Sequence, residues 1–130
     1  MSFASIHGYV IGIAIIGSWL VVMLLALVLR LVRADADNGW FWRVVSVAQV
    51  LLVVQLLAGA VLLIMGRLPS AHAFDNIFHP LYGLVFPGIV LFVGHKWSRD
   101  GRMHPLSAFA LVGLVNFGLT ARAFMVAVVG

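Results

Sequence analysis

The chain has no cysteine and only four acidic residues. Without thiols, disulfides, thiolate metal sites and cysteine nucleophiles are excluded. The acidic residues all fall outside the long apolar runs, so a proton relay built on carboxylates within a membrane is not expected. Paired carboxylates, a His-Glu-His helix pattern and a glycine-rich phosphate loop are also missing, which leaves no catalytic constellation of side chains. Any redox chemistry is therefore expected to belong to a bound cofactor.

Charge of either sign is scarce. Only 9% of the 130 residues are charged and 64% are hydrophobic, whereas soluble domains carry about 25% charged residues. The apolar residues form four runs, at about 6–29, 44–65, 80–94 and 105–129. A transmembrane helix needs about 20 apolar residues, so three runs are long enough, and the short third run begins at Pro80, a residue that suits a first helical turn. Because the links are short, we expect an all-α integral membrane protein, a single domain folded as an up-down four-helix transmembrane bundle.

The basic residues predict how this bundle lies in the membrane. Six of the eight flank two of the links, at 30–43 and 96–102, and the other two are Arg67 and Arg122. Since basic links stay in the cytoplasm, both termini are expected on the outer side. The basic residues form no stripe or reading motif, so no nucleic-acid partner is expected.

Two of the links have recognisable local signals. The first, "RADADNGWFW", is expected to stop one helix and start the next. The longest, from Arg67 to Phe78, mixes polar and aromatic residues, and a short helix lying in the membrane interface is expected there.

Five histidines are the candidate functional residues: His7 and His79 at the outer ends of the first and third runs, His95 and His104 at inner ends, and His72 in the outer link. An ionisable residue that borders a span is a functional-site candidate. The stretches "SIHGYVIG" and "IFHPLYGLV" each place a histidine before a tyrosine, as two parallel repeats would. His7 and His79 are therefore expected at matching depths, where two imidazoles on facing helices would hold the iron of a haem b.

The other histidines are expected to be structural. His79 and His95 are sixteen residues apart, which corresponds to a rise of about 24 Å and a rotation of about 160°. Their opposite faces argue against two haems stacked along one helix pair. His95 and His104 are interpreted as interfacial and helix-start residues, and His72 as a solvated one.

Several neighbours of the histidine pair have two interpretations each. Gly83 and Gly12 follow the two histidines by about one turn, where they would make room for a flat macrocycle or else allow close helix packing. Arg122 would pair with haem propionates or extend to lipid headgroups. Tyr82 would support the haem edge. Gln55, together with Tyr82 and Asn116, would bind a quinone, the second cofactor considered, or would make interhelical hydrogen bonds.

Three stretches resemble known membrane proteins. "VAQVLLVVQLLAG", "HPLYG" and "LTARAF" resemble a group of small four-span bacterial membrane proteins that carries no established activity. This resemblance implies a multi-pass protein of the bacterial inner (cytoplasmic) membrane. The histidines at helix ends are similar to those of b-type membrane cytochromes, which implies haem binding and electron transfer to a redox partner or to quinone. The chain lacks the same-face histidine pairs of two-haem cytochromes.

A different class of function also accounts for the sequence. Glycines recur along the apolar runs, at Gly8, Gly12, Gly17, Gly59, Gly113 and Gly118. Small residues let helices approach closely, so the alternative is a non-enzymatic helical scaffold or accessory subunit of a larger membrane complex. A homodimeric transporter is the third hypothesis, although the runs contain no acidic residue.

Overall fold

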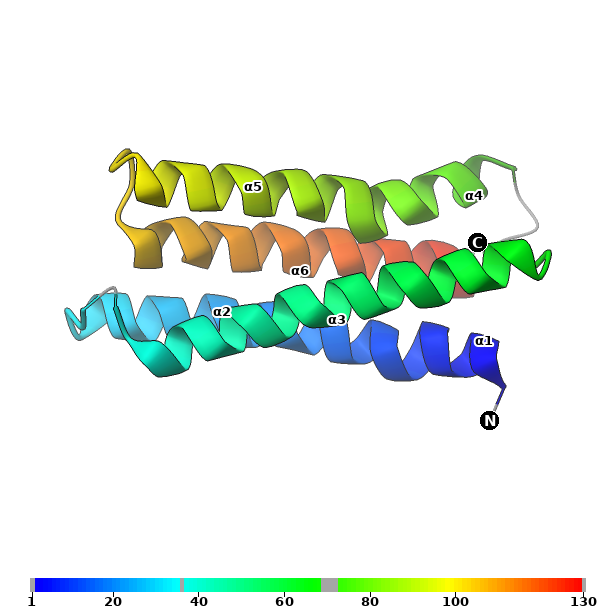
Figure 1. The fold of residues 1–130 in the computed structure, drawn as a ribbon, viewed down its shortest axis with the longest axis horizontal. Coiled ribbons are helices and arrows are strands. Elements are labelled where there is room, and N and C mark those ends of the chain that lie inside the picture. Colours follow the sequence, from blue (N-terminus) through cyan, green and yellow to red (C-terminus); the bar gives the residue numbers. More distant parts are fainter. Residues whose placement is uncertain (1, 36, 69–72, 130) are drawn as a thin grey trace.

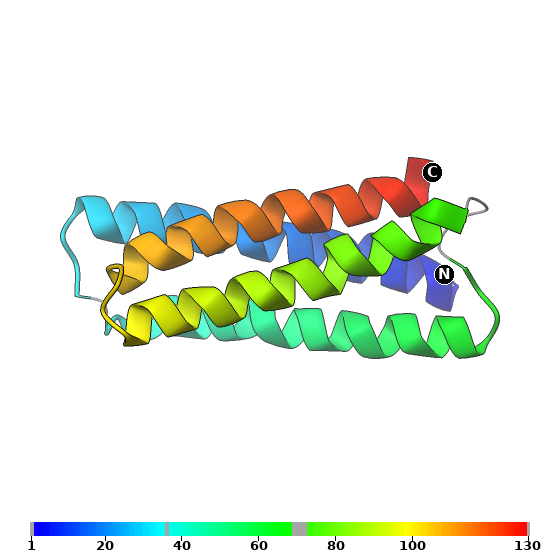
Figure 2. The same cartoon turned by 90° about the horizontal axis from the view of Figure 1, so that it is seen from above.

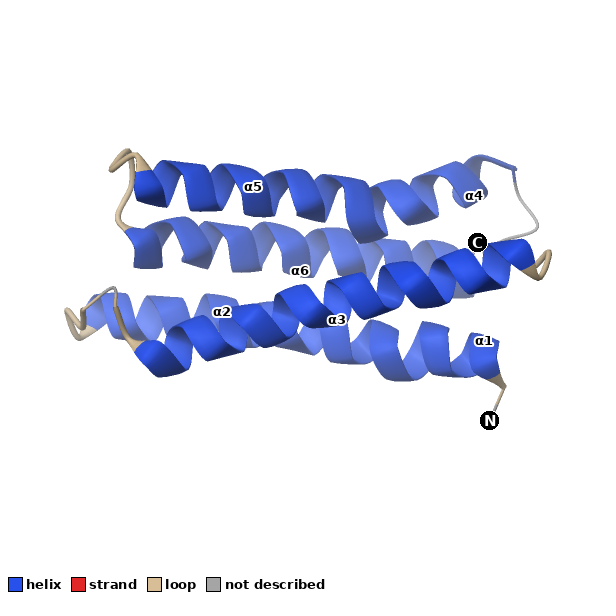
Figure 3. Ribbon diagram, in the orientation of Figure 1, coloured by secondary structure: helices blue, strands red, loops and turns tan. Residues whose placement is uncertain are grey.

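The computed structural model describes residues 2–35, 37–68 and 73–129, with side chains through residue 126. These residues are helical apart from short links (Figure 3). The elements are α1 (Phe3–Ser5), η1 (Ile6–Ile11), α2 (Gly12–Leu31), α3 (Gly39–Ile64), α4 (Ala73–Pro80), η2 (Leu81–Val85), α5 (Phe86–Arg99) and α6 (Pro105–Val129), of which η1 and η2 are π-helical. They join into four helices that are long and apolar enough to cross a membrane: Phe3–Leu31, Gly39–Ile64, Ala73–Arg99 and Pro105–Val126.

The four helices lie lengthwise beside one another and alternate in direction (Figures 1 and 2). Both chain termini lie at one end of the bundle, called here the terminal end. The links 32–38 and 100–104 lie at the opposite end. α2 packs against both α3 and α6, and α6 packs in turn against α5. The expected up-down helical arrangement is therefore confirmed.

Helix starts follow the expected local signals at the opposite end. The side-chain oxygen of Asn38 accepts a hydrogen bond from the Phe41 N–H at 3.0 Å, so the first link does contain an N-cap. His104 caps α6 in a similar way, because its Nδ1 accepts from the Leu106 N–H at 3.2 Å. Pro105 follows as the first helical residue, where its missing N–H costs nothing.

The first three long helices end in the same motif. The residue just past each C-cap has a positive φ, at Arg33 (55°), Gly66 (74°) and Gly101 (72°). The next N–H reaches back to a carbonyl of the last turn, as from Arg67 to Leu62 at 2.8 Å. This Schellman geometry satisfies carbonyls that would otherwise lack a partner. Glycine adopts it without strain, whereas Arg33 does not.

The third helix is longer than the expected 80–94. It begins at Ala73 and runs to Arg99, so the helical residues of the preceding link continue directly into the span rather than forming a separate interfacial helix. Pro80 lies inside this helix and not at its start. Proline has no N–H to donate and its ring displaces the carbonyl of the preceding turn, and the chain continues from Pro80 as the π-helical segment η2. His72 lies outside the described residues.

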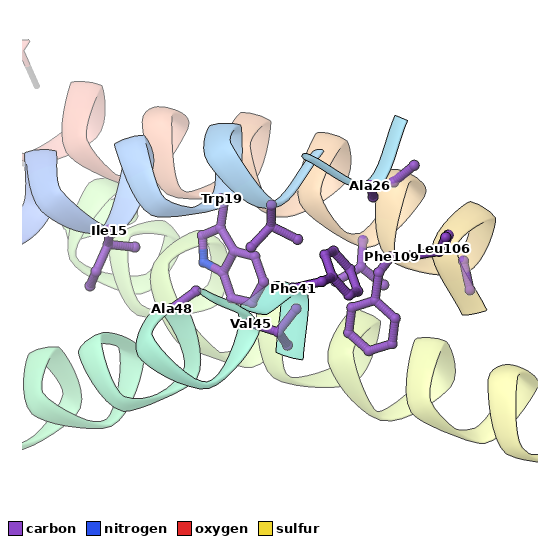
Figure 4. Close-up of a cluster of buried hydrophobic side chains, with 12 residues drawn as sticks. Ile15, Trp19, Ala26, Phe41, Val45, Ala48, Leu106 and Phe109 are labelled. Atoms are coloured by element: carbon purple, nitrogen blue, oxygen red, sulfur yellow. The ribbon is translucent and has the colours of Figure 1, made fainter. Parts of the chain in front are cut away.

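The apolar core lies toward the opposite end. Trp19, Phe41 and Phe109 are fully buried there, and Figure 4 shows them beside Val45 and Leu106. A Cβ added at Gly113 would lie 2.6 Å from the Met23 backbone nitrogen and 2.9 Å from the Trp19 carbonyl oxygen. α2 and α6 therefore meet backbone to backbone, as small residues permit.

Candidate histidine site

His7 and His79 face each other near the terminal end. His7 comes from η1 and His79 from α4, and their ring centres are 6.2 Å apart with an interplanar angle of 67°. Both side chains are partly buried. The expected proximity of the two imidazoles is confirmed, while their role as metal ligands stays a prediction.

The ring of His79 is oriented by α6. Its Nδ1 lies 2.9 Å from the carbonyl oxygen of Ala123. A carbonyl oxygen only accepts, so Nδ1 donates and carries the ring proton. In a neutral ring this leaves the lone pair on Nε2, which is the arrangement found in most metal-binding histidines.

α3 holds the segment that carries His7. The side-chain nitrogen of Gln55 donates to the backbone carbonyl of His7 at 3.1 Å. A Cβ added at Gly59 would lie 3.3 Å from Cε1 of the His7 ring, so the glycine leaves the space that this ring occupies. Among the described residues, Nδ1 of His7 and Oε1 of Gln55 are buried without a hydrogen-bond partner. Two polar atoms of the site are thus available to a ligand or to water.

Both histidines adjoin π-helical segments. His7 lies within η1, and His79 is followed by Pro80 and then η2. These are the π-helical segments in the part of the chain that the structure describes. π-helical turns occur frequently at functional sites. The two "His…Tyr" stretches that suggested a repeat thus share an unusual backbone as well as a sequence pattern.

Gly12 and Gly83 contact α6 rather than opening onto a cavity. A Cβ at Gly12 would lie 3.5 Å from Cδ2 of Phe124, and one at Gly83 would lie 3.3 Å from Cβ of Ala123. Of the two interpretations left open by the sequence, these contacts favour close helix packing. A macrocycle would therefore enter beside these glycines only if the start of α2 and η2 moved away from α6.

Tyr82 contacts other aromatic side chains, and Arg122 is exposed. The Tyr82 ring stacks on Phe78 at 5.8 Å and meets Phe86 edge to face at 5.8 Å, which makes an aromatic row along the third helix. Arg122 is exposed, although the next residue, Ala123, supplies the carbonyl that binds His79. Their proposed contacts with a haem edge and with propionates stay predictions.

Asn116 and Thr120 form a buried polar pair on α6. Nδ2 of Asn116 donates to the Pro87 carbonyl at 3.5 Å, and the Thr120 hydroxyl donates to the Asn116 carbonyl at 2.7 Å. Asn116 is 0% exposed, and its Oδ1 has no partner among the described residues. The bond to Pro87 is the interhelical hydrogen bond that the sequence suggested.

The sequence did not predict a second histidine contact at the opposite end. Nε2 of His95 lies 3.0 Å from the side-chain nitrogen of Gln49, and its ring lies 4.8 Å from that of Phe109 and 6.4 Å from that of Trp42. His95 therefore ties α5 to α3 and α6. No sequence pattern connects residues so far apart.

The fold and the site define a class: a helical protein with four membrane-length helices and a facing histidine pair near one end. Within residues 2–35, 37–68 and 73–129, no group of three or more histidine, aspartate or glutamate side chains is arranged to hold a metal ion. A metal centre here would depend on the two imidazoles and on donors from a cofactor. Comparisons with models of protein families, with curated proteins and with solved structures gave no match to the chain.

Proposed function

We propose that this is a b-type haem-binding protein of the bacterial inner membrane, in which His7 and His79 are the axial ligands and electrons pass to a redox partner or to quinone. The facing pair of imidazoles carries the proposal. An imidazole nitrogen lies about 2 Å from a bound metal ion, so His7 and His79 would both reach one ion only with their ring centres within about 6 Å of each other. The observed separation is 6.2 Å.

The protein's part in this function is to bind and orient. The Ala123 carbonyl holds His79 in the tautomer that presents Nε2, and Gln55 anchors the backbone of His7. Arg122 would neutralise propionates at the terminal end, and Tyr82 would line the haem edge. When bound, haem supplies one-electron chemistry whose potential depends on its axial ligands and surroundings.

The absorption spectrum of the purified chain tests the proposal. Protein from haem-supplemented cells is expected to show a Soret band, which His7→Ala and His79→Ala abolish. His95→Ala removes a histidine at the opposite end and is expected to leave the band unchanged. The proposal fails if wild-type protein shows no Soret band in any redox state, or if the band survives both ligand substitutions.

A second candidate function is that of an accessory subunit of a larger complex. It is supported by helix surfaces that no other part of the described chain covers. Gly8, Gly17 and Gly118 would each accept a Cβ with no atom within 4 Å. In α5 the buried residues are Pro87 and Gly94, so most of that helix faces outward. Membrane partners that co-purify stoichiometrically in a gentle detergent would support this candidate. A lone haem-bearing monomer or homodimer would count against it.

A further inference from the structure

An open groove of about 320 Å³ runs between α2 and α3 at the opposite end. It is lined by Ser18, Val21, Trp40, Arg43, Val44 and Val47. The Ser18 hydroxyl already donates to the Ile15 carbonyl at 2.7 Å. The groove walls are therefore apolar, and Arg43 lines them with the carbon stem that carries its guanidinium.

That guanidinium lies 5.1 Å from the centre of the Trp40 ring. The carboxylates nearest in sequence are Asp35 and Asp37, yet among the described residues none forms an ion pair with Arg43. The first turn of α3 contains no acidic residue, and a helix N-terminus carries partial positive charge. Beside the groove, the start of α3 thus carries positive charge that has no anionic partner among the described residues.

We propose that this groove binds one anionic phospholipid. Its phosphate would contact Arg43 beside the Trp40 ring, and one acyl chain would lie along Val21, Val44 and Val47. Tryptophan favours the headgroup level of a bilayer, and Val47 lies about 10 Å deeper along α3 than Trp40. Basic pockets between transmembrane helices on the cytoplasmic side attract anionic headgroups. The proposal requires the chain to lie in a bilayer and is independent of haem.

Lipid retention by the full-length chain tests the site. Native mass spectrometry would compare delipidated protein given phosphatidylglycerol or phosphatidylcholine with identical acyl chains. Phosphatidylglycerol is expected to be retained preferentially, and Arg43→Gln to weaken its retention about fivefold, the usual effect of one basic residue at an anionic surface. Arg102→Gln, which removes the same charge from the link 100–104 at this end, is expected to change retention little. Equal retention of both lipids, or equal losses in the two variants, would overturn the proposal.

A second variant tests whether an acyl chain lies along the groove walls. Val47 is 57% exposed, so Val47→Phe can fill the groove without disturbing the core. It is expected to reduce phosphatidylglycerol retention as Arg43→Gln does. Unchanged retention in Val47→Phe, or displacement of the lipid by millimolar inorganic phosphate, would show that the groove walls hold no acyl chain and that the anion alone is recognised.

Discussion

Single residues set how closely the helices approach, and Gly113 gives the sharpest example. A Cβ there would meet backbone atoms of Met23 and Trp19, which cannot rotate away as a side chain can. Gly113→Ala is therefore expected to destabilise the protein by about 1–3 kcal/mol, as overpacking does. Gly17→Ala is the matched control, because no atom lies within 4 Å of its added Cβ. It is expected to be neutral or to gain up to about 1 kcal/mol of helix propensity.

Thermal unfolding in detergent would give the melting temperatures of the Gly113→Ala and Gly17→Ala variants. A melting temperature for Gly113→Ala equal to that of Gly17→Ala would show that α2 and α6 do not meet backbone to backbone at this point.

Among single residues, the histidine pair could be predicted from the sequence, whereas the hydrogen bonds that hold histidine-bearing segments in place could not. His7 and His79 share a local pattern, and that pattern placed them at matching depths. Gln55 was singled out as a polar residue, but its hydrogen bond to the backbone of His7 depends on helix rotation that no sequence pattern fixes. The contact of Gln49 with His95 joins positions 46 residues apart and was missed for the same reason.

The helix starts at the opposite end were predictable, because caps are local. Asn38 caps the start of α3. His104 caps α6, and Pro105 is the first residue of that helix. The third helix was misjudged because Pro80 resembles a helix start, and the polar pair Asp75 and Asn76 before it resembles a link. The π-helical segments have no residue signature of their own. They became visible only when the backbone was known.

The Schellman motifs that end the first three long helices lead to a prediction for two opposite substitutions, one that introduces a glycine and one that removes a glycine. Arg33 holds φ at 55° where Gly101 holds 72° in the equivalent position. A residue with a Cβ is less stable than glycine by about 1 kcal/mol in this left-handed conformation. Arg33→Gly is therefore expected to raise the melting temperature and Gly101→Ala to lower it, by similar free energies of opposite sign. Positions 33 and 101 are both exposed, so packing changes little in either variant.

Chemical denaturation in detergent would give the two free energies directly. A stabilising Gly101→Ala would contradict the left-handed geometry assigned to that helix end, since its added Cβ has open space and only backbone strain opposes it.

The whole molecule is divided along its length. Large apolar side chains fill the opposite half, where Trp19, Phe41 and Phe109 are fully buried. The terminal half contains the histidine pair and the unpartnered buried atoms of His7 and Gln55. A well-packed half keeps the helices together, whereas segments with fewer buried apolar contacts open at lower free energy. This division favours ligand entry at the terminal end, which is where the proposed haem would have to separate Gly12 and Gly83 from α6.

The orientation predicted for the bundle in a membrane depends on charge alone, and it can be tested without background labelling because the chain has no cysteine. Asp37 and Leu68 are both exposed, and they lie in links at the two different ends. If basic links stay in the cytoplasm, Leu68→Cys reacts with a membrane-impermeant thiol reagent in intact spheroplasts. Asp37→Cys is expected to react only after permeabilisation. The reverse pattern would place the histidine pair on the cytoplasmic side and the Arg43 groove in the outer leaflet, against both proposals.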